Sequence, residues 1–210
     1  MKARALPPFL VLVALPLLAC MTLAGGAQFD VGLTKVERPA NAKQRYGDTK
    51  ITQVADSAGH HRYLFEDQLV SILWVPLSDQ IAFYVTNKTD HSIKIVWDEA
   101  AFIDEGQQSH RVMHNGVKYI DRNQSEPPTI VAGNSSLFDE IVPTDHVDFL
   151  GGSWITSPLV MATDSTKSGK VGKTLRVLLP LSIEDVVNEY TFTFTIDTLV
   201  HANADSSAGK

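Results

Sequence analysis

Histidines are the side chains whose types and spacing first suggest chemistry in this sequence, because the chain has seven of them. His110 and His114 stand four residues apart, which on a helix would present two imidazoles to one zinc ion. Asn115-Gly116 instead predicts a β-hairpin, so both histidines should lie on a strand, about 13 Å apart at ~3.3 Å per residue. On an extended segment, His60-His61 would point to opposite faces. We therefore expect no metal ion and no other cofactor at these histidines.

Asp145-His146 and the many serines raise the alternative of a hydrolase, in which a base and a carboxylate activate a hydroxyl group. None of the serines stands in a nucleophile elbow. The acid pair Asp139-Glu140 falls on a predicted strand, where neighbouring side chains diverge and cannot act as a matched acid and base at one bond. Neither Gly25-Gly26 nor Gly151-Gly152 lies between a strand and a helix, as a phosphate-binding loop would. The sequence therefore predicts no enzyme, and a hydrolase is the least favoured alternative.

The first nineteen residues are typical of an export signal. Lys2 and Arg4 precede an apolar run from Ala5 to Leu18, which is short for a membrane span and is interrupted by prolines. The segment ends in Leu17-Leu18-Ala19-Cys20, and Cys20 is the only cysteine of the chain. A thiol is a strong nucleophile that can be alkylated where a serine hydroxyl cannot.

This segment resembles the lipobox of bacterial lipoproteins, which has a leucine three residues before its cysteine. The resemblance implies that residues 1–19 are removed and that Cys20 becomes the N-terminus, with a diacylglyceryl group on its sulfur. Met21 follows Cys20 where inner-membrane lipoproteins have an aspartate, which implies the periplasmic side of the outer membrane in a Gram-negative cell. Two or more acyl chains hold a protein firmly, so we expect the membrane to be a partner through the lipid anchor. The alternative is a buried or incidental thiol behind an ordinary secretory signal.

The charge balance and the single cysteine restrict the folded part further. Removing Lys2 and Arg4 from the 18 basic residues leaves 16 against 24 acidic ones, a net charge of −8. A surface of that sign argues against binding to nucleic acid or to anionic lipid headgroups. With Cys20 used for the anchor, no cysteine is left for a disulfide, so the domain must hold together by its core alone.

We expect one folded domain. Residues 20–49 are mostly polar and lack a sustained period, which indicates a lipidated N-terminus and a flexible tether, with a short strand possible at 29–33. Residues 50–199 then form the domain, and residues 200–210 form a polar tail.

Alternating apolar residues predict short strands through the whole domain. Residues 79–104 should form the central hairpin, with its turn at Asn87. Asn115-Gly116 predicts a second hairpin, in which Val112 pairs with Tyr119. Residues 175–182 and 190–199 predict a third, with a turn of helix at 183–188. Further strands are expected at 62–66, 69–75, 101–104, 129–131 and 137–142.

Frequent strands separated by turn signals favour an all-β fold, a two-layer antiparallel β-sandwich with Trp74 and Trp97 in its core. Residues 87–104, 110–145 and 175–197 are similar to a family of bacterial lipoproteins whose shared core is an immunoglobulin-like domain, and the similarity covers most of residues 60–197. It implies an immunoglobulin-like β-sandwich and a location in the cell envelope. It assigns no functional residue other than Cys20.

The segment from Asp148 to Met161 is the candidate contact region. Phe149, Leu150, Trp154 and Ile155 lie beside two glycines in a stretch without a regular strand pattern. Exposed, they would form an apolar patch that binds an envelope protein, a peptide or a glycan. Covered, they would close one end of the sandwich, which is the preferred interpretation because monomeric domains hide such apolar area. We predict a non-catalytic envelope module that acts by contact, with a peptide- or glycan-binding module as the alternative.

Overall fold

The computed structural model describes residues 28–39, 46–55, 61–163 and 166–200 of the 210-residue chain. The predicted export signal, Cys20 and residues 201–210 of the predicted tail lie outside these ranges, and so does His60. Within them the fold is all-β and antiparallel, with fourteen strands and four short 3-10 turns. The predicted fold class is confirmed at that level.

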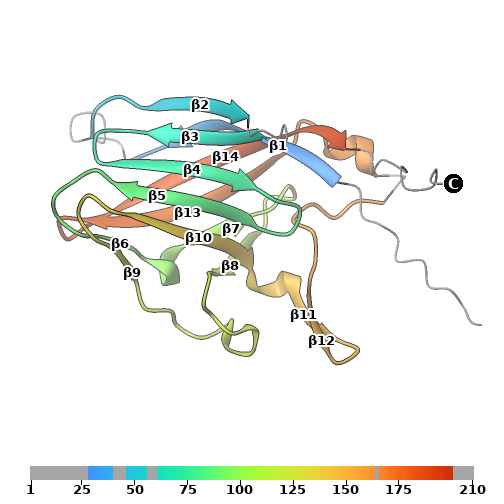
Figure 1. The fold of residues 1–210 in the computed structure, drawn as a ribbon. Coiled ribbons are helices and arrows are strands. Elements are labelled where there is room, and N and C mark those ends of the chain that lie inside the picture. The colour runs from blue at the N-terminus through green and yellow to red at the C-terminus, as the bar shows by residue number, and fades with distance from the viewer. Residues whose placement is uncertain (1–27, 40–45, 56–60, 164–165, 201–210) are drawn as a thin grey trace, which may run out of the picture.

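Twelve strands form one large sheet, and the other two form a separate hairpin, β11–β12. Ten strands of the large sheet follow the order β1-β14-β13-β7-β8-β10-β5-β4-β3-β2, while β6 pairs with β13 and β9 (Figure 1). The strands are β1 (Gln28–Glu37), β2 (Lys50–Ala55), β3 (His61–Glu66), β4 (Val70–Pro76), β5 (Ile81–Asn87), β6 (Ile93–Ile95), β7 (Ala101–Ile103), β8 (Ser109–Met113), β9 (Thr129–Val131), β10 (Ser136–Pro143), β11 (Val147–Leu150), β12 (Ser153–Thr156), β13 (Thr174–Ile183) and β14 (Val186–Val200).

The large sheet curls until its two ends approach each other. Asp30 on β1 lies 3.8 Å from His61 on β3, measured between the carboxylate Oδ2 and the imidazole Nε2. In the interior, the ring centroid of Trp74 on β4 lies 4.6 Å from that of Phe192 on β14, although several strands separate β4 from β14 in the sheet order. The two halves of the sheet therefore face each other across one core, which contains Trp74 and Trp97 as predicted.

The C-terminal hairpin forms as predicted, but its turn does not. β13 and β14 pair along their length up to Ile183 and Val186. The helical turn predicted at residues 183–188 is wrong, because Glu184 and Asp185 have positive φ angles of 49° and 61°. Two residues in that conformation make a tight hairpin turn whose twist matches that of the strands.

The central hairpin predicted at residues 79–104 is wrong. Both strands exist, but β5 pairs with β4 and β10, whereas β6 pairs with β13 and β9. The side chain of Asn87 accounts for this, since its Oδ1 accepts from the backbone N–H of Thr89 and its Nδ2 donates to the carbonyl groups of Val131 and Ala132. The amide fastens the turn to the segment after β9, and the chain crosses to the other half of the sheet.

The Asn115-Gly116 turn forms, but the strand predicted after it is wrong. The backbone N–H of Val117 donates to the carbonyl group of His114. The carboxylate of Asp139 accepts from the backbone N–H of Asn115 at 2.9 Å, which attaches the turn to β10. The chain then enters the 3-10 turn η2 (Tyr119–Asp121), and β8 pairs with β7 and β10 instead.

The folded region begins earlier than the tether predicted for residues 20–49 allows. β1 already pairs with β14 from Gln28 onward, and Tyr46 is only 1% exposed. The strand suspected at 29–33 is therefore real and longer. Register shifts after Asp30 and after Leu33 interrupt its apolar alternation, which is why the sequence pattern did not extend it.

Candidate functional site

The segment between β10 and β13 carries the apolar residues predicted for partner contact. After the 3-10 turn η3 (Thr144–His146), β11 and β12 pair with Phe149 opposite Trp154. Gly151-Gly152 connects the two strands with positive φ angles of 62° and 87°, which glycine adopts without strain. We call β11–β12 the apolar hairpin.

Four large apolar side chains of the apolar hairpin are exposed. The exposed fraction is 60% for Phe149, 68% for Leu150, 38% for Trp154 and 42% for Ile155. The preferred interpretation, in which these residues close one end of the domain, is therefore wrong. Leu159, farther along the same segment, does pack into the core and is 3% exposed.

The exposed side chains lie on both faces of the apolar hairpin. Phe149 and Trp154 share one face, with their ring centroids 5.2 Å apart. Leu150 and Ile155 lie on the opposite face, because side chains alternate along a strand. An apolar environment that shielded all four would therefore have to surround the hairpin.

Arg122 and Tyr119 hold the Trp154 ring in place. The Arg122 guanidinium lies 5.2 Å from the centroid of the Trp154 ring, a cation–π contact. The same guanidinium donates to the carbonyl groups of Thr144 and Tyr119 at 3.0 and 2.8 Å. Tyr119 also meets Trp154 edge-on, with ring centroids 5.7 Å apart. Trp154 is thus held by two contacts and is still partly exposed. The aliphatic part of the neighbouring Arg122 side chain can lie along apolar surface while its charged group stays in water.

The apolar hairpin projects from the same end of the sheet at which β1 begins (Figure 1). Gln28, the first residue of β1, pairs with Val200 near the C-terminal end of β14. Residues 21–27 are all that separates Gln28 from Cys20 in the sequence. Eight residue steps span at most about 29 Å when fully extended, which is the upper limit on the length of a tether between Cys20 and β1.

Imidazole and carboxylate groups gather at the base of the apolar hairpin. His110 on β8 places its Nδ1 2.7 Å from Asp145 Oδ2 and its Nε2 3.3 Å from Asp104 Oδ2. The ring of His146 packs against that of His110, with centroids 5.6 Å apart. We call Asp104, His110, Asp145 and His146 the base cluster.

The carboxylates of the base cluster perturb its proton equilibria. Burial lowers the pKa of His110, but hydrogen bonding and charge from Asp145 and Asp104 outweigh burial, so this pKa lies above its ordinary value. Burial raises the pKa of Asp104, yet the hydrogen bond from the backbone N–H of Gln108 and the nearby His110 imidazole bring it below its ordinary value. Both shifts favour a protonated His110 beside an ionised Asp104.

The base cluster does not have the arrangement expected for the hydrolase alternative. Among the described residues, no serine or threonine hydroxyl forms a hydrogen bond with His146, although its Nδ1 is buried and lacks a partner. Asp139 and Glu140 diverge as predicted, since Asp139 accepts from Asn115 whereas Glu140 accepts from Gln80.

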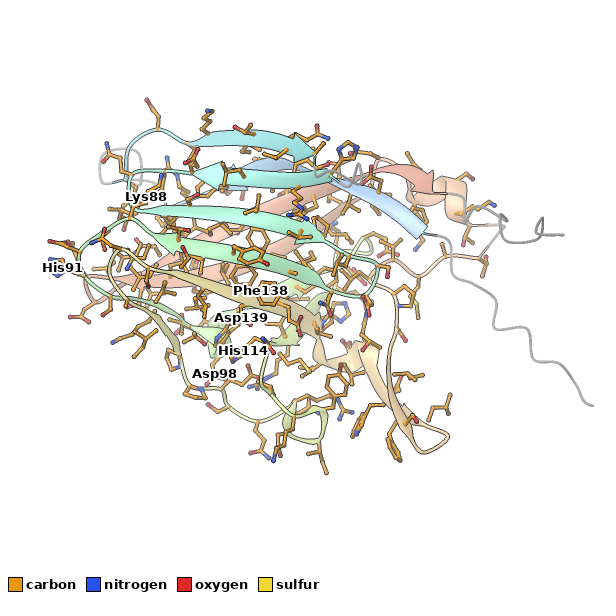
Figure 2. The ribbon with its side chains drawn as sticks, in the orientation of Figure 1. Lys88, His91, Asp98, His114, Phe138 and Asp139 are labelled. Carbon is orange, nitrogen blue, oxygen red and sulfur yellow. The ribbon has the colours of Figure 1, made fainter. Side chains whose placement is uncertain are left out.

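His114 belongs to a second and more buried cluster (Figure 2). Its ring stacks on Trp97 with centroids 4.2 Å apart and planes 4° from parallel. Its Nδ1 lies 3.3 Å from Asp139 and its Nε2 3.6 Å from Glu126. Burial is the largest influence on Glu126 and raises its pKa, although the charge of His114 acts in the opposite direction. This cluster joins the turn after β8, the strand β10 and the segment before β9.

Sequence reasoning missed the meeting of His110 and His146. The two residues are 36 positions apart, and they meet because β10 pairs with β8 and places η3 beside His110. That pairing is a long-range choice that no local pattern reveals. The available signal was the Asp145-His146 pair directly after a strand.

An open depression of about 530 Å³ lies elsewhere on the described surface. It contains no aromatic ring and no residue of the apolar hairpin, so it does not provide the aromatic cleft that a peptide or glycan site beside Trp154 would need. Its lining residues are Glu37, Arg38, Pro39, Glu99, Val187, Glu189 and Thr191.

Within the described ranges, no helical segment has both the length and the apolar character required to cross a bilayer. Comparison with known proteins gives no relative: the chain matches no family model, no curated protein and no solved structure.

Proposed function

We propose that this chain is a non-catalytic, lipid-anchored module of the bacterial cell envelope that also contacts its own membrane through the apolar hairpin. One observation carries the proposal: large apolar side chains are exposed on both faces of a hairpin at the end of the sheet where β1 begins. The lipobox resemblance supports lipidation of Cys20 and the envelope location. The lipid on Cys20 is the first attachment, and the apolar hairpin is the second.

A bilayer suits the apolar hairpin better than a flat protein surface does. A flat partner covers one face of a hairpin, whereas a lipid layer surrounds a tip that enters it. The exposed fractions of the four side chains amount to about two whole side chains, so burying them contributes roughly 3–6 kcal/mol at ~1.5–3 kcal/mol each. That is weak for a free protein, but the short tether to Cys20 keeps the hairpin at a high effective concentration near the membrane.

The net charge of the mature chain predicts how membrane contact should depend on lipid charge and on salt. Its net charge of −8 provides no electrostatic attraction to anionic headgroups. Contact through the apolar hairpin should therefore be as strong on neutral vesicles as on anionic ones, and it should not weaken as salt is added.

Vesicle flotation tests the second attachment separately from the first. The mature chain with Cys20→Ser carries no lipid, and with neutral phospholipid vesicles at millimolar lipid it should float in part. Adding Phe149→Ser and Leu150→Ser should abolish flotation. Ile130→Ser is the matched control, because Ile130 is 63% exposed on β9, outside the apolar hairpin. Equal flotation of the hairpin variant and the control would refute the proposal.

A photoreactive residue in place of Trp154 distinguishes lipid from other occupants in intact cells. An adduct with phospholipid supports membrane contact. A defined adduct with an envelope protein or with a glycan would replace this proposal by the partner-binding alternative for the same hairpin.

We also propose that the domain is a two-layer, immunoglobulin-like sandwich. Ring contacts between β3 or β4 and β14 support two packed layers, since Phe65 and Trp74 both lie against Phe192. The short distance between Asp30 and His61 favours a more closed sheet. An experimental structure with a continuous backbone ladder between β1 and β2 would contradict the sandwich.

A further inference from the structure

We propose that the base cluster binds a transition-metal dication of the Zn²⁺ class, with His110, Asp145 and His146 as ligands. This inference does not rest on membrane contact by the apolar hairpin. It concerns a different set of side chains, located where the hairpin joins the large sheet.

The three side chains already offer ligand atoms within a small volume. One ligand atom from each residue can be chosen so that all lie within 4.8 Å of one another. A tetrahedral ion with bonds of ~2.0–2.1 Å holds its ligands roughly 3.4 Å apart, so the groups must close by at most about 1.4 Å. Asp145 can supply that movement because its side chain is 60% exposed, whereas the His110 side chain is 10% exposed and fixed.

One buried imidazole nitrogen in the base cluster has no partner. His146 Nδ1 is inaccessible to solvent and has no hydrogen-bond partner. Buried polar atoms are rarely left in this state. His110 Nε2 is also buried and without a well-aligned hydrogen bond, but it lies 3.3 Å from the carboxylate of Asp104. A metal ion bound by both imidazoles would give His146 Nδ1 a partner.

Asp104 completes the arrangement expected around a metal-binding histidine. His110 Nδ1 faces Asp145, while Nε2 lies 3.3 Å from Asp104 on the other side of the ring. Histidines that bind a metal usually donate their second N–H to a carboxylate, which fixes the ring orientation. His110 Nδ1 would then bind the ion, and a small rotation would align Nε2–H with Asp104.

The donor set selects the class of ion. Two neutral imidazoles and one carboxylate suit Zn²⁺ and its first-row neighbours, whereas Ca²⁺ and Mg²⁺ prefer oxygen ligands. The His114 cluster is a poorer candidate, because it offers one imidazole and two buried carboxylates. Its ring is also stacked on Trp97, which fixes its position.

Zn²⁺ titration of the mature chain without an affinity tag, followed by calorimetry at pH 7.5, tests the site. We expect one ion per chain with a dissociation constant in the micromolar range or below. Asp145→Asn and His146→Gln should each weaken binding at least about tenfold, as the loss of groups around bound metals does. Both positions are accessible enough for the variants to fold, which far-UV circular dichroism verifies.

His91→Gln is the matched control. His91 Nε2 lies 3.4 Å from Asp90 in an exposed pair at a different place on the molecule (Figure 2), so it reports adventitious binding by a surface His–Asp pair. Its removal should leave Zn²⁺ affinity unchanged. Substitution with Co²⁺ adds a second readout, because a four-coordinate site gives strong visible absorption that His146→Gln should remove.

Three results would overturn the inference. The first is the absence of saturable Zn²⁺ binding below about 100 µM. The second is equal affinity in the wild type and in His146→Gln, which would place the ion at other histidines. The third is binding of Ca²⁺ or Mg²⁺ as tightly as Zn²⁺, which would indicate a site made of carboxylates alone.

Discussion

Replacing Trp97 by alanine should destabilise the domain by about 3–5 kcal/mol, the usual cost of removing a buried tryptophan. Trp97 is 2% exposed, its Nε1 donates to Thr129 Oγ1 at 2.8 Å, and its ring covers one face of His114. Alanine therefore leaves a cavity, an unpaired hydroxyl on Thr129 and a partly buried His114 imidazole without its stacking partner. The free-energy cost of the lost hydrogen bond can be distinguished from the total cost, since loss of one neutral hydrogen bond costs only about 0.5–1.5 kcal/mol.

A series of three variants measures those effects. Thr129→Val removes the hydrogen bond alone and should cost about 1 kcal/mol. Trp97→Phe retains an aromatic ring and should fall between Thr129→Val and Trp97→Ala. Urea unfolding followed by far-UV circular dichroism is the assay, and with a slope of ~2 kcal/mol/M the alanine variant should lose about 1.5–2.5 M from its midpoint. A loss below about 0.5 M, or a phenylalanine variant less stable than the alanine variant, would refute this account of the core.

Three further predictions concern other parts of the chain. Burial raises the pKa of the Glu126 carboxyl group above its ordinary value of 4.5. The folded state therefore binds the carboxyl proton more tightly than the unfolded state does. The free energy of unfolding should fall as pH rises from 4.5 through the raised pKa. Glu126→Gln should flatten that part of a stability-versus-pH profile, and an unchanged profile would contradict the assignment. Gly133→Ala should lower the urea midpoint, because a Cβ there would lie 2.4 Å from the backbone oxygen of Asp90, whereas Gly169→Ala meets no atom within 4 Å and should leave the midpoint nearly unchanged. Cys20→Ser should leave the precursor uncleaved and without lipid in intact-mass spectrometry, and an acylated, processed variant would exclude the lipobox.

The sequence predicts the strands of this domain better than their partners. Periods of two reveal β3, β4, β5, β10, β13 and β14, because each strand has one face toward the core. Strand pairing depends on contacts between distant segments. The polar turn at Asn87 has the composition of a hairpin turn, but the Asn87 side chain bonds to the segment after β9. The Asn115-Gly116 turn failed as a hairpin signal for a similar reason, because Asp139 attaches it to β10.

The candidate site was predictable in composition but not in geometry. The sequence identifies Phe149, Leu150, Trp154 and Ile155, but whether such residues are covered depends on the rest of the fold, and the general tendency of domains to hide apolar area gave the wrong answer. The spacing of side chains along a strand correctly predicts that His110 and His114 do not share one site. The same spacing says nothing about His146, which lies beside His110 because of strand pairing and not because of sequence proximity.

The pairing of β1 with β14 has a consequence for how and when the protein folds. Gln28 meets Val200, and Phe192 supplies part of the core around Trp74, so the first and last strands of the described chain complete the same structure. A chain still lacking its final segment cannot finish this sheet, and contacts so distant in sequence form slowly. If the chain is exported as proposed above, slow formation of these contacts would keep the polypeptide unfolded for longer, as passage through a secretion channel requires.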